Sequence, residues 1–345
     1  MSKAQQLAKE LNAVLGAGTV RMGNDPSLKV RFIPTGVLPI DVLLQGGIPR
    51  GRFTEIFGAY STLKSYIALR AIAETQKAGG VAALVDTEHA FDPAWAESLG
   101  VVVDDLIYKT PDTGEEAVDI SEFLIRSNVD LLVWDSVAAT VPQSLATKRL
   151  SKETIQPARL AALMSEASRK LTTANSSTAV LFINQTRINV GQLFGDPETT
   201  PGGKAMGFYA SYRLAFRKAG KLTDTVTMYD SDGKKVTGKE TYAHKIKVVV
   251  EKSKLNKPHR ETMLTFDLRT GAIDEVGFMI SYGLENGLIN HEGQMWWLKG
   301  KQTKHRGVEK FRQSLTEADL DRLRNACLGV LSPVKSKAVV RRKKS

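Results

Sequence analysis

Between residues 51 and 185, short apolar runs alternate with stretches of helical period. Each run ends in glycine or in polar residues, and the runs cover residues 53–57, 81–86, 130–135 and 179–184. The helical stretches between them cover residues 64–78, 115–126 and 157–173. This alternation predicts βα units and a mainly parallel sheet, and therefore an α/β fold. Because ligands bind beyond the carboxyl ends of such strands, we expect the polar residues that follow the runs to converge in space.

The N-terminal residues have a different pattern. Ser2 can cap a helix, and residues 16–24 after it read as a loop. The apolar positions of this helix fall on one stripe, formed by Leu7, Leu11, Val14 and Leu15. The loop sets the helix apart from the main body, so the stripe must pack either on this chain's own core or on a neighbouring copy.

A segment rich in Gly, Thr and Pro follows the last of the four apolar runs, over residues 186–206. Loops of this length inside a compact domain are usually functional or disordered. This segment begins where a strand ends, near the expected ligand site, and its position favours a function.

The rest of the chain predicts more strands and a second unit. The strands are expected at 208–216, 245–250 and 261–267, with a surface hairpin or loop over 223–241. From about residue 276 the pattern indicates a small α+β unit that ends in a helix over 317–328. Cys327 falls on the apolar face of that helix, so we interpret it as a core thiol.

Composition narrows the class of protein. The 345 residues are 42% hydrophobic and 25% charged, as in ordinary globular proteins. No run of 18 apolar residues and no secretory signal is visible, so we expect a cytoplasmic protein with no membrane contact. The single cysteine excludes an intramolecular disulfide and a multi-cysteine zinc site.

The charge points to a polyanionic partner. The net charge is +11, and residues 331–345 hold six Lys or Arg and no acid. The residues before this tail include basic segments with tryptophans at 296 and 297, a combination that suits nucleic acid. The alternatives are a solvated surface and a merely solubilising tail.

The strongest motif follows the first apolar run and opens the first helical stretch, as a phosphate-binding loop does. It consists of Gly58, Ala59, Tyr60, Ser61, Thr62, Leu63, Lys64 and Ser65. Leu63 replaces the second glycine of the pattern GxxxxGK[ST], which puts the loop geometry in question. We expect Lys64 to reach the β and γ phosphates of ATP and the Ser65 hydroxyl to ligate Mg²⁺.

The other strand ends supply the remaining groups of a nucleotide hydrolysis site. Asp135 can hold Mg²⁺ as a second acidic anchor, although an aspartate here can also cap a helix. Glu88 can act as the general base for the attacking water, and Gln185 can contact the γ phosphate. Lys, Ser, Glu, Asp and Gln at four strand ends together predict hydrolysis of a nucleoside triphosphate.

Several long stretches resemble the RecA family of homologous recombination proteins, which are encoded by bacteria and phages. They are GRFTEIFG, DTEHAFDPAWAESLGV, PDTGEEAVDI, WDSVAATVPQ, FINQTRINVGQLFGDPETTPGG and FYASYRL, and the similarity runs from about residue 5 to 330. Phage recombinases also tolerate a bulky residue before the loop lysine, so Leu63 indicates a phage-encoded member.

The resemblance implies a RecA-like P-loop ATPase core with a mainly parallel sheet. It also implies an N-terminal oligomerisation helix and a small α+β C-terminal domain. The expected boundaries are 1–33 for the helix and its linker, 34–268 for the core, 269–330 for the C-terminal domain and 331–345 for a basic disordered tail.

The resemblance also implies roles for individual residues. Glu88 matches the glutamate that activates water, Asp135 the Walker B aspartate and Gln185 the glutamine that couples the γ phosphate to a DNA loop. Asp92 and Trp95 match positions that contact adenine. Lys252 and Lys254 match lysines that reach the ATP of the next subunit, and Phe208 matches an interface residue.

Two segments match the DNA loops of the family. Residues 143–156 lie where the first loop is expected, but their sequence departs from the bacterial pattern. The second loop and the helix behind it supply the expected DNA contacts, which are Ser165, Arg169, Ile188, Val190, Gly202, Gly203 and Lys204.

From this resemblance we expect a recombinase that binds ATP and Mg²⁺ and forms a helical filament on single-stranded DNA. It would pair that strand with homologous double-stranded DNA and exchange strands, with DNA-stimulated ATP hydrolysis. Single-strand-binding or loader proteins are left open as partners. Two alternatives also stay open: a filament protein that binds ATP and hydrolyses little of it, and a ring-forming motor of RecA fold.

Overall fold

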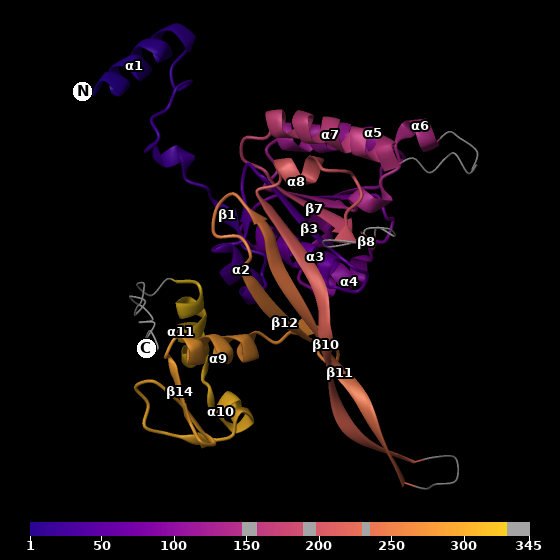
Figure 1. The fold of residues 1–345 in the computed structure, drawn as a ribbon, viewed down its shortest axis with the longest axis vertical. Helices are drawn as coiled ribbons and strands as arrows, with labels where there is room; N and C mark the ends of the chain where they lie inside the picture. The colour runs from indigo at the N-terminus through magenta and orange to yellow at the C-terminus, as the bar shows by residue number, and fades with distance from the viewer. Residues whose placement is uncertain (147–156, 189–197, 230–234, 330–345) are drawn as a thin grey trace, which may run out of the picture.

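The computed structural model describes residues 1–146, 157–188, 198–229 and 235–329. Its centre is a nine-stranded sheet in the order β13-β12-β11-β10-β3-β7-β6-β4-β5 (Figure 1). The strands are β3 (Phe53–Gly58), β4 (Ala82–Asp86), β5 (Leu106–Lys109), β6 (Leu131–Asp135), β7 (Ala179–Gln185), β10 (Tyr212–Tyr229), β11 (Lys235–Ser253), β12 (Glu261–Asp267) and β13 (Ala272–Ile273). A short pair, β1 (Phe32–Ile33) and β2 (Ile48–Pro49), lies beside it.

The parallel part of the sheet confirms the four strands expected from the apolar runs. Strands β3, β7, β6, β4 and β5 are parallel neighbours, and β10 runs parallel to β3. The register aligns Gly58 with Gln185 and Asp86 with Asp135. The polar strand ends therefore meet at one edge of the sheet, as predicted.

Helices cover both faces of these strands, which explains why the strands are apolar throughout. On one face α3 (Lys64–Lys77) packs on Ile56, Leu84 and Val133. The other face is covered by α5 (Gly114–Arg126), α7 (Pro157–Ala174) and α8 (Ala205–Tyr209). The predicted helices at 64–78, 115–126 and 157–173 are confirmed to within two residues at each end.

The antiparallel part of the sheet corrects one expectation and confirms another. The strand predicted over 208–216 begins only at Tyr212, because residues 205–209 form helix α8. The surface hairpin expected over 223–241 is confirmed, because β10 and β11 are antiparallel neighbours there and extend as a two-stranded ribbon well past the core (Figure 1). The Thr residues at every second position from Thr223 to Thr227 suit such a ribbon.

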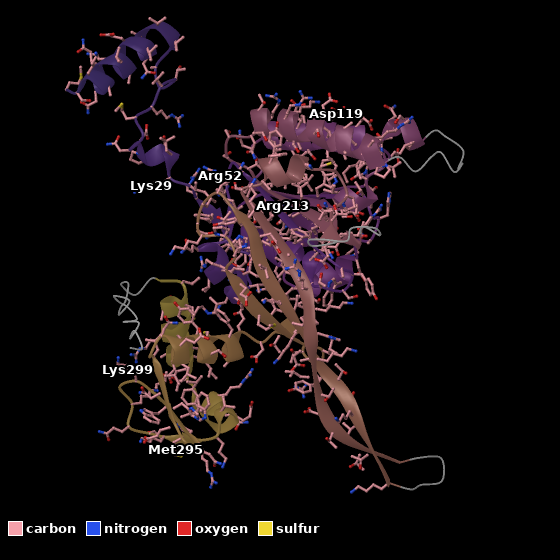
Figure 2. The ribbon with its side chains drawn as sticks, in the orientation of Figure 1. Lys29, Arg52, Asp119, Arg213, Met295 and Lys299 are labelled. Carbon is pink, nitrogen blue, oxygen red and sulfur yellow. The ribbon has the colours of Figure 1, made fainter. Side chains whose placement is uncertain are left out.

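Helix α1 (Lys3–Leu15) stands away from the rest of the protein (Figures 1 and 2). Ser2 caps it, as predicted, in a reciprocal arrangement with Gln5. None of its residues is buried, and Leu7 and Leu11 are each close to half exposed. Asn12 fixes the exit from the helix, because its side chain donates to Val20 O and accepts from Val20 N, both at 2.8 Å.

The C-terminal unit contains α9 (Glu275–Glu285), α10 (Val308–Ser314), α11 (Glu317–Cys327) and a three-stranded sheet. Its strands are β14 (Ile289–Glu292), β15 (Met295–Leu298) and β16 (His305–Arg306). Leu38 of α2 (Leu38–Leu44) joins the apolar cluster of this unit. Cys327 is buried in the same cluster, where burial raises the pKa of its thiol to about 11, as fits a core thiol.

Two further observations concern the expected organisation. Strand β13 pairs with β12, so the central sheet continues beyond residue 268, where we placed a boundary.

In the part of the chain that the structure describes, no helix is long and apolar enough to cross a bilayer. The remaining short helices are α4 (Pro93–Ser98), α6 (Gln143–Ala146) and the single turns at Pro26–Leu28, Val103–Asp105 and Val137–Ala139.

Candidate nucleotide site and DNA interface

The phosphate-binding loop connects β3 to α3, in the strand-to-helix context that the motif requires. Leu63 has φ 69° and ψ 16°, in the left-handed region, and Ser61 has φ 55°. This conformation explains why the common pattern has glycine at position 63, and a leucine there costs about 1–2 kcal/mol. The side chain of Leu63 packs against the apolar cluster around α3, which offsets part of that cost. The loop therefore keeps its turn despite the substitution.

Lys64 lies inside this loop and is nearly buried. Its Nζ donates to Gly58 O at 3.1 Å and to Ala59 O at 2.7 Å. Burial lowers the pKa of Lys64, while the negative charges of Asp135 and Glu88 act in the opposite direction. The ammonium group is thus held at the N-terminal end of α3, where a triphosphate would also gain from the helix dipole.

Ser65 and Asp135 meet at the same edge of the sheet. The Ser65 hydroxyl donates to Asp135 Oδ2 at 2.9 Å. Burial raises the pKa of Asp135 to about 7, and the nearby negative charge of Glu88 contributes to this increase. A divalent cation at this point would favour the ionised carboxylate.

The side chains of Ser65 and Asp135 both bear oxygen atoms. Such a pair suits Mg²⁺, which keeps several waters, better than a metal ion that is bound entirely by protein side chains. Among the described residues, no group of three or more His, Cys, Asp or Glu could hold a metal ion. Mg²⁺ commonly uses one or two protein oxygens and completes its shell with phosphate and water. Ser65 and Asp135 supply protein oxygens of this kind and in this number.

Glu88 and Gln185 come from different strand ends and contact each other. Gln185 Nε2 donates to Glu88 Oε1 at 2.8 Å, and Ser136 Oγ donates to the same oxygen at 2.5 Å. Both Glu88 and Gln185 are exposed at the sheet edge, so a water molecule has access to the carboxylate. The expected general base and the expected γ-phosphate sensor are thus in direct contact.

Asp86 is an organising residue whose role the sequence analysis did not recognise. It is almost completely buried, and its carboxylate accepts backbone N–H bonds from residues 88, 89, 90 and 91. It also accepts from the hydroxyl of Tyr108. These bonds determine the position of Glu88. An aspartate at a strand end, followed by a run of residues without secondary structure, was the signal that could have revealed it.

Asp92 and Trp95 lie near the phosphate loop, as their expected adenine contact requires. A small pocket is lined by Asp92, Trp95, Ser65 and Asp135, together with apolar residues of α3. Asp92 caps helix α4 by accepting from the N–H groups of Ala94 and Trp95. Trp95 is 42% exposed, so part of its indole ring is accessible for stacking.

Lys252 and Lys254 do not join the phosphate loop of their own chain. Lys252 is the register partner of Arg213, and Arg213 is the register partner of Glu55. Glu55 precedes Gly58, the first residue of the phosphate loop, by three residues. This offset is roughly 10 Å along the strand direction. Both ammonium groups donate to Phe208 O at the C-terminal end of α8, Lys252 at 3.0 Å and Lys254 at 2.7 Å. Burial lowers the pKa of Lys252, and the positive charge of Lys254 adds to this effect.

Comparisons with known proteins agree with this geometry. The model of the RecA N-terminal domain matches residues 3–272. The chain is 44% identical over 314 residues to Protein RecA of Thermus aquaticus, and the alignment covers 90% of this chain and 88% of that protein. It is 40% identical over 323 residues to Protein RecA of Rubrobacter xylanophilus, with 92% and 89% covered.

The chain belongs to the RecA family. It is therefore a DNA-dependent ATPase with an ATP-dependent role in recombination, and the expectation of a recombinase is confirmed. RecA proteins use a nucleotide, bind DNA and form filaments, and the RecA-like α/β core expected from the sequence is also confirmed.

The described part of the expected second DNA loop begins and ends close to Gln185. Arg187–Ile188 forms β8, which pairs with β9 (Glu198–Thr199), whereas Val190 lies outside the described residues. Gly202 and Gly203 both have positive φ. A Cβ on Gly202 would lie 2.9 Å from Val137 Cγ1, and one on Gly203 would lie 2.7 Å from Ala161 Cβ. Only glycine lets this end of the loop approach α7 so closely.

The other expected DNA contacts lie around the same helix. Ser165 and Arg169 are exposed one turn apart on α7, and Lys204 is exposed immediately before α8. Of the first expected DNA loop, residues 143–146 form α6, and residues 147–156 lie outside the described residues. The structure thus brings Ser165, Arg169, Gly202, Gly203 and Lys204 to one side of the sheet.

Proposed function

We propose that this RecA family protein forms a helical filament on single-stranded DNA, with MgATP bound between adjacent subunits, and catalyses homologous pairing and strand exchange. The contact between Gln185 and Glu88 carries this proposal. It joins the group that would activate water to the residue from which the second DNA loop starts. Hydrolysis and DNA binding can therefore influence each other through one hydrogen bond.

Within one subunit, each group of the nucleotide site has a separate role. The N–H groups of residues 58–65 and the Lys64 ammonium bind and orient the triphosphate. Ser65 and Asp135 would hold Mg²⁺, which would supply neutralisation of the charge on the transferred γ-phosphoryl group and on the leaving ADP. Glu88 accepts the proton of the attacking water, and Asp92 and Trp95 hold the adenine.

The second half of the site comes from the next subunit. Lys252 and Lys254 donate to α8 in the isolated chain, and we propose that they turn to the triphosphate of a neighbour in the filament. Phe208 lies beside them on α8 and is 71% exposed, as expected of an interface residue. The apolar side chains of α1 pack on a neighbouring subunit, so the contact is head-to-tail and generates a filament.

The DNA contacts follow the second loop and α7. Ile188 and Val190 separate groups of bases, while Gly202, Gly203 and Lys204 lie beside the phosphates. Ser165 and Arg169 add contacts to the backbone. Contacts of this kind position the strand without reading its sequence, so homology is tested by base pairing with the incoming double-stranded DNA.

The domain boundaries and the setting belong to the same proposal. Residues 1–33 dock the subunits, residues 34–268 with the adjoining strand β13 hold the ATPase site and DNA loops, and the remainder up to residue 330 forms the C-terminal domain. We place the protein in the bacterial cytoplasm or nucleoid, that of the host if a phage encodes it, with single-strand-binding or loader proteins left open as partners.

Two assays test this function. ATP hydrolysis is measured with and without single-stranded DNA for the native chain and for Lys64→Ala, and strand pairing is measured with a matched and an unmatched duplex. We expect DNA to stimulate the native chain alone, and pairing to require the matched duplex. Native hydrolysis equal to that of Lys64→Ala would favour the ATP-binding filament with little turnover, which Leu63 motivates. Closed hexamers without filaments in electron micrographs would favour a ring-forming motor.

A further inference from the structure

A buried ion pair lies between the nucleotide end of the sheet and the second DNA loop. Glu55 is in the middle of β3 and has no exposed surface, and its Oε2 accepts from Arg213 Nε at 2.5 Å. Glu55 and Arg213 are register partners on adjacent strands. A buried carboxylate is costly unless all of its acceptor positions are used, so the bonds of Glu55 call for an explanation.

The second carboxylate oxygen of Glu55 connects to the strand that carries Gln185. Asn184 Nδ2 donates to Glu55 Oε1 at 2.9 Å, and Asn184 Oδ1 accepts from Gln185 N at 2.9 Å. Asn184 is itself fully buried. The backbone of Gln185, whose side chain bonds Glu88, is therefore held in place through Glu55.

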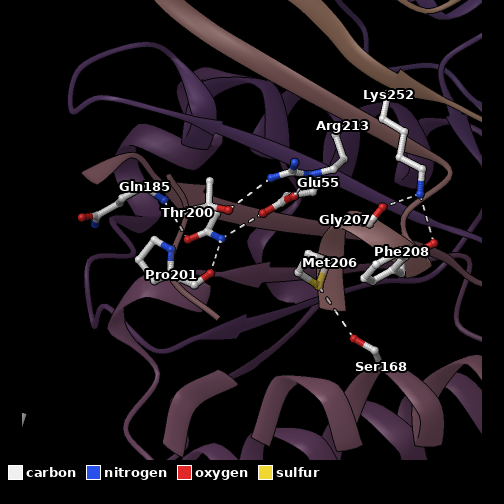
Figure 3. A network of polar contacts seen from close by, with 11 residues as sticks. Glu55, Ser168, Gln185, Thr200, Pro201, Met206, Gly207, Phe208, Arg213 and Lys252 are labelled. Atoms are coloured by element: carbon white, nitrogen blue, oxygen red, sulfur yellow. Dashed lines mark hydrogen bonds and ion pairs between the residues drawn. The ribbon is translucent and has the colours of Figure 1, made fainter. Parts of the chain in front are cut away.

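Two of these side chains, Arg213 and Asn184, also hold the far end of the loop. Arg213 Nη2 donates to Thr200 Oγ1 at 3.1 Å, and Asn184 Nδ2 donates to Pro201 O at 3.0 Å (Figure 3). The loop thus leaves the sheet at Gln185 and returns to it at residues 200–201, and both points depend on one buried cluster. Figure 3 shows Gly207 and Phe208, which belong to α8, and Lys252 next to this cluster.

We propose that Glu55, with Arg213 and Asn184, is a positioning group that couples the nucleotide site to the second DNA loop. Glu55 touches neither nucleotide nor DNA. It fixes the two ends of the loop relative to Gln185, so that a shift of Gln185 toward a γ phosphate is transmitted to Thr200 and Pro201. This inference rests on the proposed function, because it assumes that residues 186–204 contact DNA.

The test compares Glu55→Gln with a matched variant elsewhere in the sheet. Asp130 is the control, because its carboxylate also bonds one arginine, Arg50 Nη1 at 2.7 Å, and one N–H, that of Val81 at 2.8 Å. It lies at the amino end of β6, at the opposite end of that strand from Asp135. For each variant we measure MgATP affinity, the melting temperature and the ratio of DNA-stimulated to basal ATP hydrolysis.

We expect Glu55→Gln to bind MgATP about as tightly as the native chain while its stimulation ratio falls about fivefold or more. Asp130→Asn should keep the native ratio even if its melting temperature falls by the same amount. A purely structural role for Glu55 predicts a lower melting temperature with an unchanged stimulation ratio. A native ratio in folded Glu55→Gln would overturn the proposal.

Thr200→Val provides a second variant if Glu55→Gln does not fold. It removes only the hydroxyl that accepts from Arg213 and keeps the side-chain volume. We expect the stimulation ratio to fall about twofold or more, and an unchanged ratio would refute the coupling. Failure of the coupling proposal can be distinguished from failure of the proposed function, because in the second case DNA would not stimulate ATP hydrolysis by the native chain.

Discussion

Gln185 Nε2 lies 2.8 Å from Glu88 Oε1, although 97 residues separate the two in the chain. The contact exists because β7 and β4 both flank β6, so that their carboxyl ends reach the same edge. Ser136, which follows β6, donates to the same oxygen of Glu88. Three strand ends therefore determine where the carboxylate points.

Replacing Glu88 with Gln removes the proposed general base while preserving the shape of the side chain. We expect the ATP turnover rate to fall by about 10²–10⁴-fold, because a carboxamide cannot accept the proton of water. MgATP affinity should remain close to native, since Glu88 does not hold the phosphates. Glu97→Gln, on the exposed side of α4, is the control and should hydrolyse ATP normally. A Glu88→Gln variant with native turnover would exclude Glu88 as the base.

Asp135 predicts a pH dependence of stability in the absence of nucleotide. Burial raises its pKa to about 7 in the folded protein, above its value in the unfolded chain. The contribution of Asp135 to stability is therefore present at low pH and is lost as the pH rises through about 7. Asp135→Asn avoids this loss, so we expect its melting temperature to exceed the native one by about 3 °C at pH 8 and to equal it near pH 4.

Asp41 provides the control for this measurement. It is buried, accepts two hydrogen bonds from Thr35, and burial also raises its pKa to about 7. Asp41→Asn should show a similar gain at pH 8 but keep Mg²⁺-dependent ATP binding, which Asp135→Asn should lose. Equal Mg²⁺ dependence in the two variants would contradict the metal role of Asp135.

Mixing two inactive variants tests whether ATP lies between subunits. Lys64→Ala and Lys252→Ala should each hydrolyse little ATP alone. In a mixed filament, about a quarter of the interfaces combine an intact Lys64 with an intact Lys252 from the neighbour, so about a quarter of the native rate should return. A mixture of Lys64→Ala with Glu88→Gln should stay inactive, because one subunit supplies both residues to each ATP site and no subunit in the mixture has both. No recovery in the first mixture would place Lys252 outside the shared site.

A polar substitution in the apolar stripe of α1 should impair filament assembly without impairing the folding of the subunit. Leu11 is 46% exposed in the single chain, so Leu11→Gln should leave the melting temperature of the subunit within about 1 °C of native. Filament formation with MgATP and single-stranded DNA, followed by light scattering, should require a higher protein concentration. Lys9→Gln, on the opposite side of the helix, is the control. Identical assembly of the two variants would argue against docking through this stripe.

Deleting residues 331–345 removes six positive charges from the chain. We expect weaker binding to double-stranded DNA at moderate salt, because fewer counterions are released from the duplex. ATP hydrolysis on single-stranded DNA should change little, since the proposed loops and the ATP site are retained. Unchanged affinity for the duplex would show that the tail only adds solubility.

The sequence predicted the ATP site more completely than it predicted the sheet around it. Gly58, Lys64, Asp135 and Glu88 could be recognised because each follows a buried apolar run, and parallel strands place such positions at one edge. A surface hairpin over 223–241 was also predicted, but its continuity with the strands of the central sheet was not, because glycine and charged residues interrupt the alternation between Phe216 and Thr223.

The α/β sheet and the polar residues that follow its strands could be predicted from the sequence, since hydrophobic period and local motifs are properties of neighbouring residues. The pairing of Glu55 with Arg213, and the bonds from Asn184 to both ends of one loop, became visible only in the folded protein. The fold also places Lys252 away from its own phosphate loop. These relationships depend on strand order and register, which arise from packing between distant segments of the chain. Glu55 and Asn184, for example, are more than a hundred residues apart in the sequence.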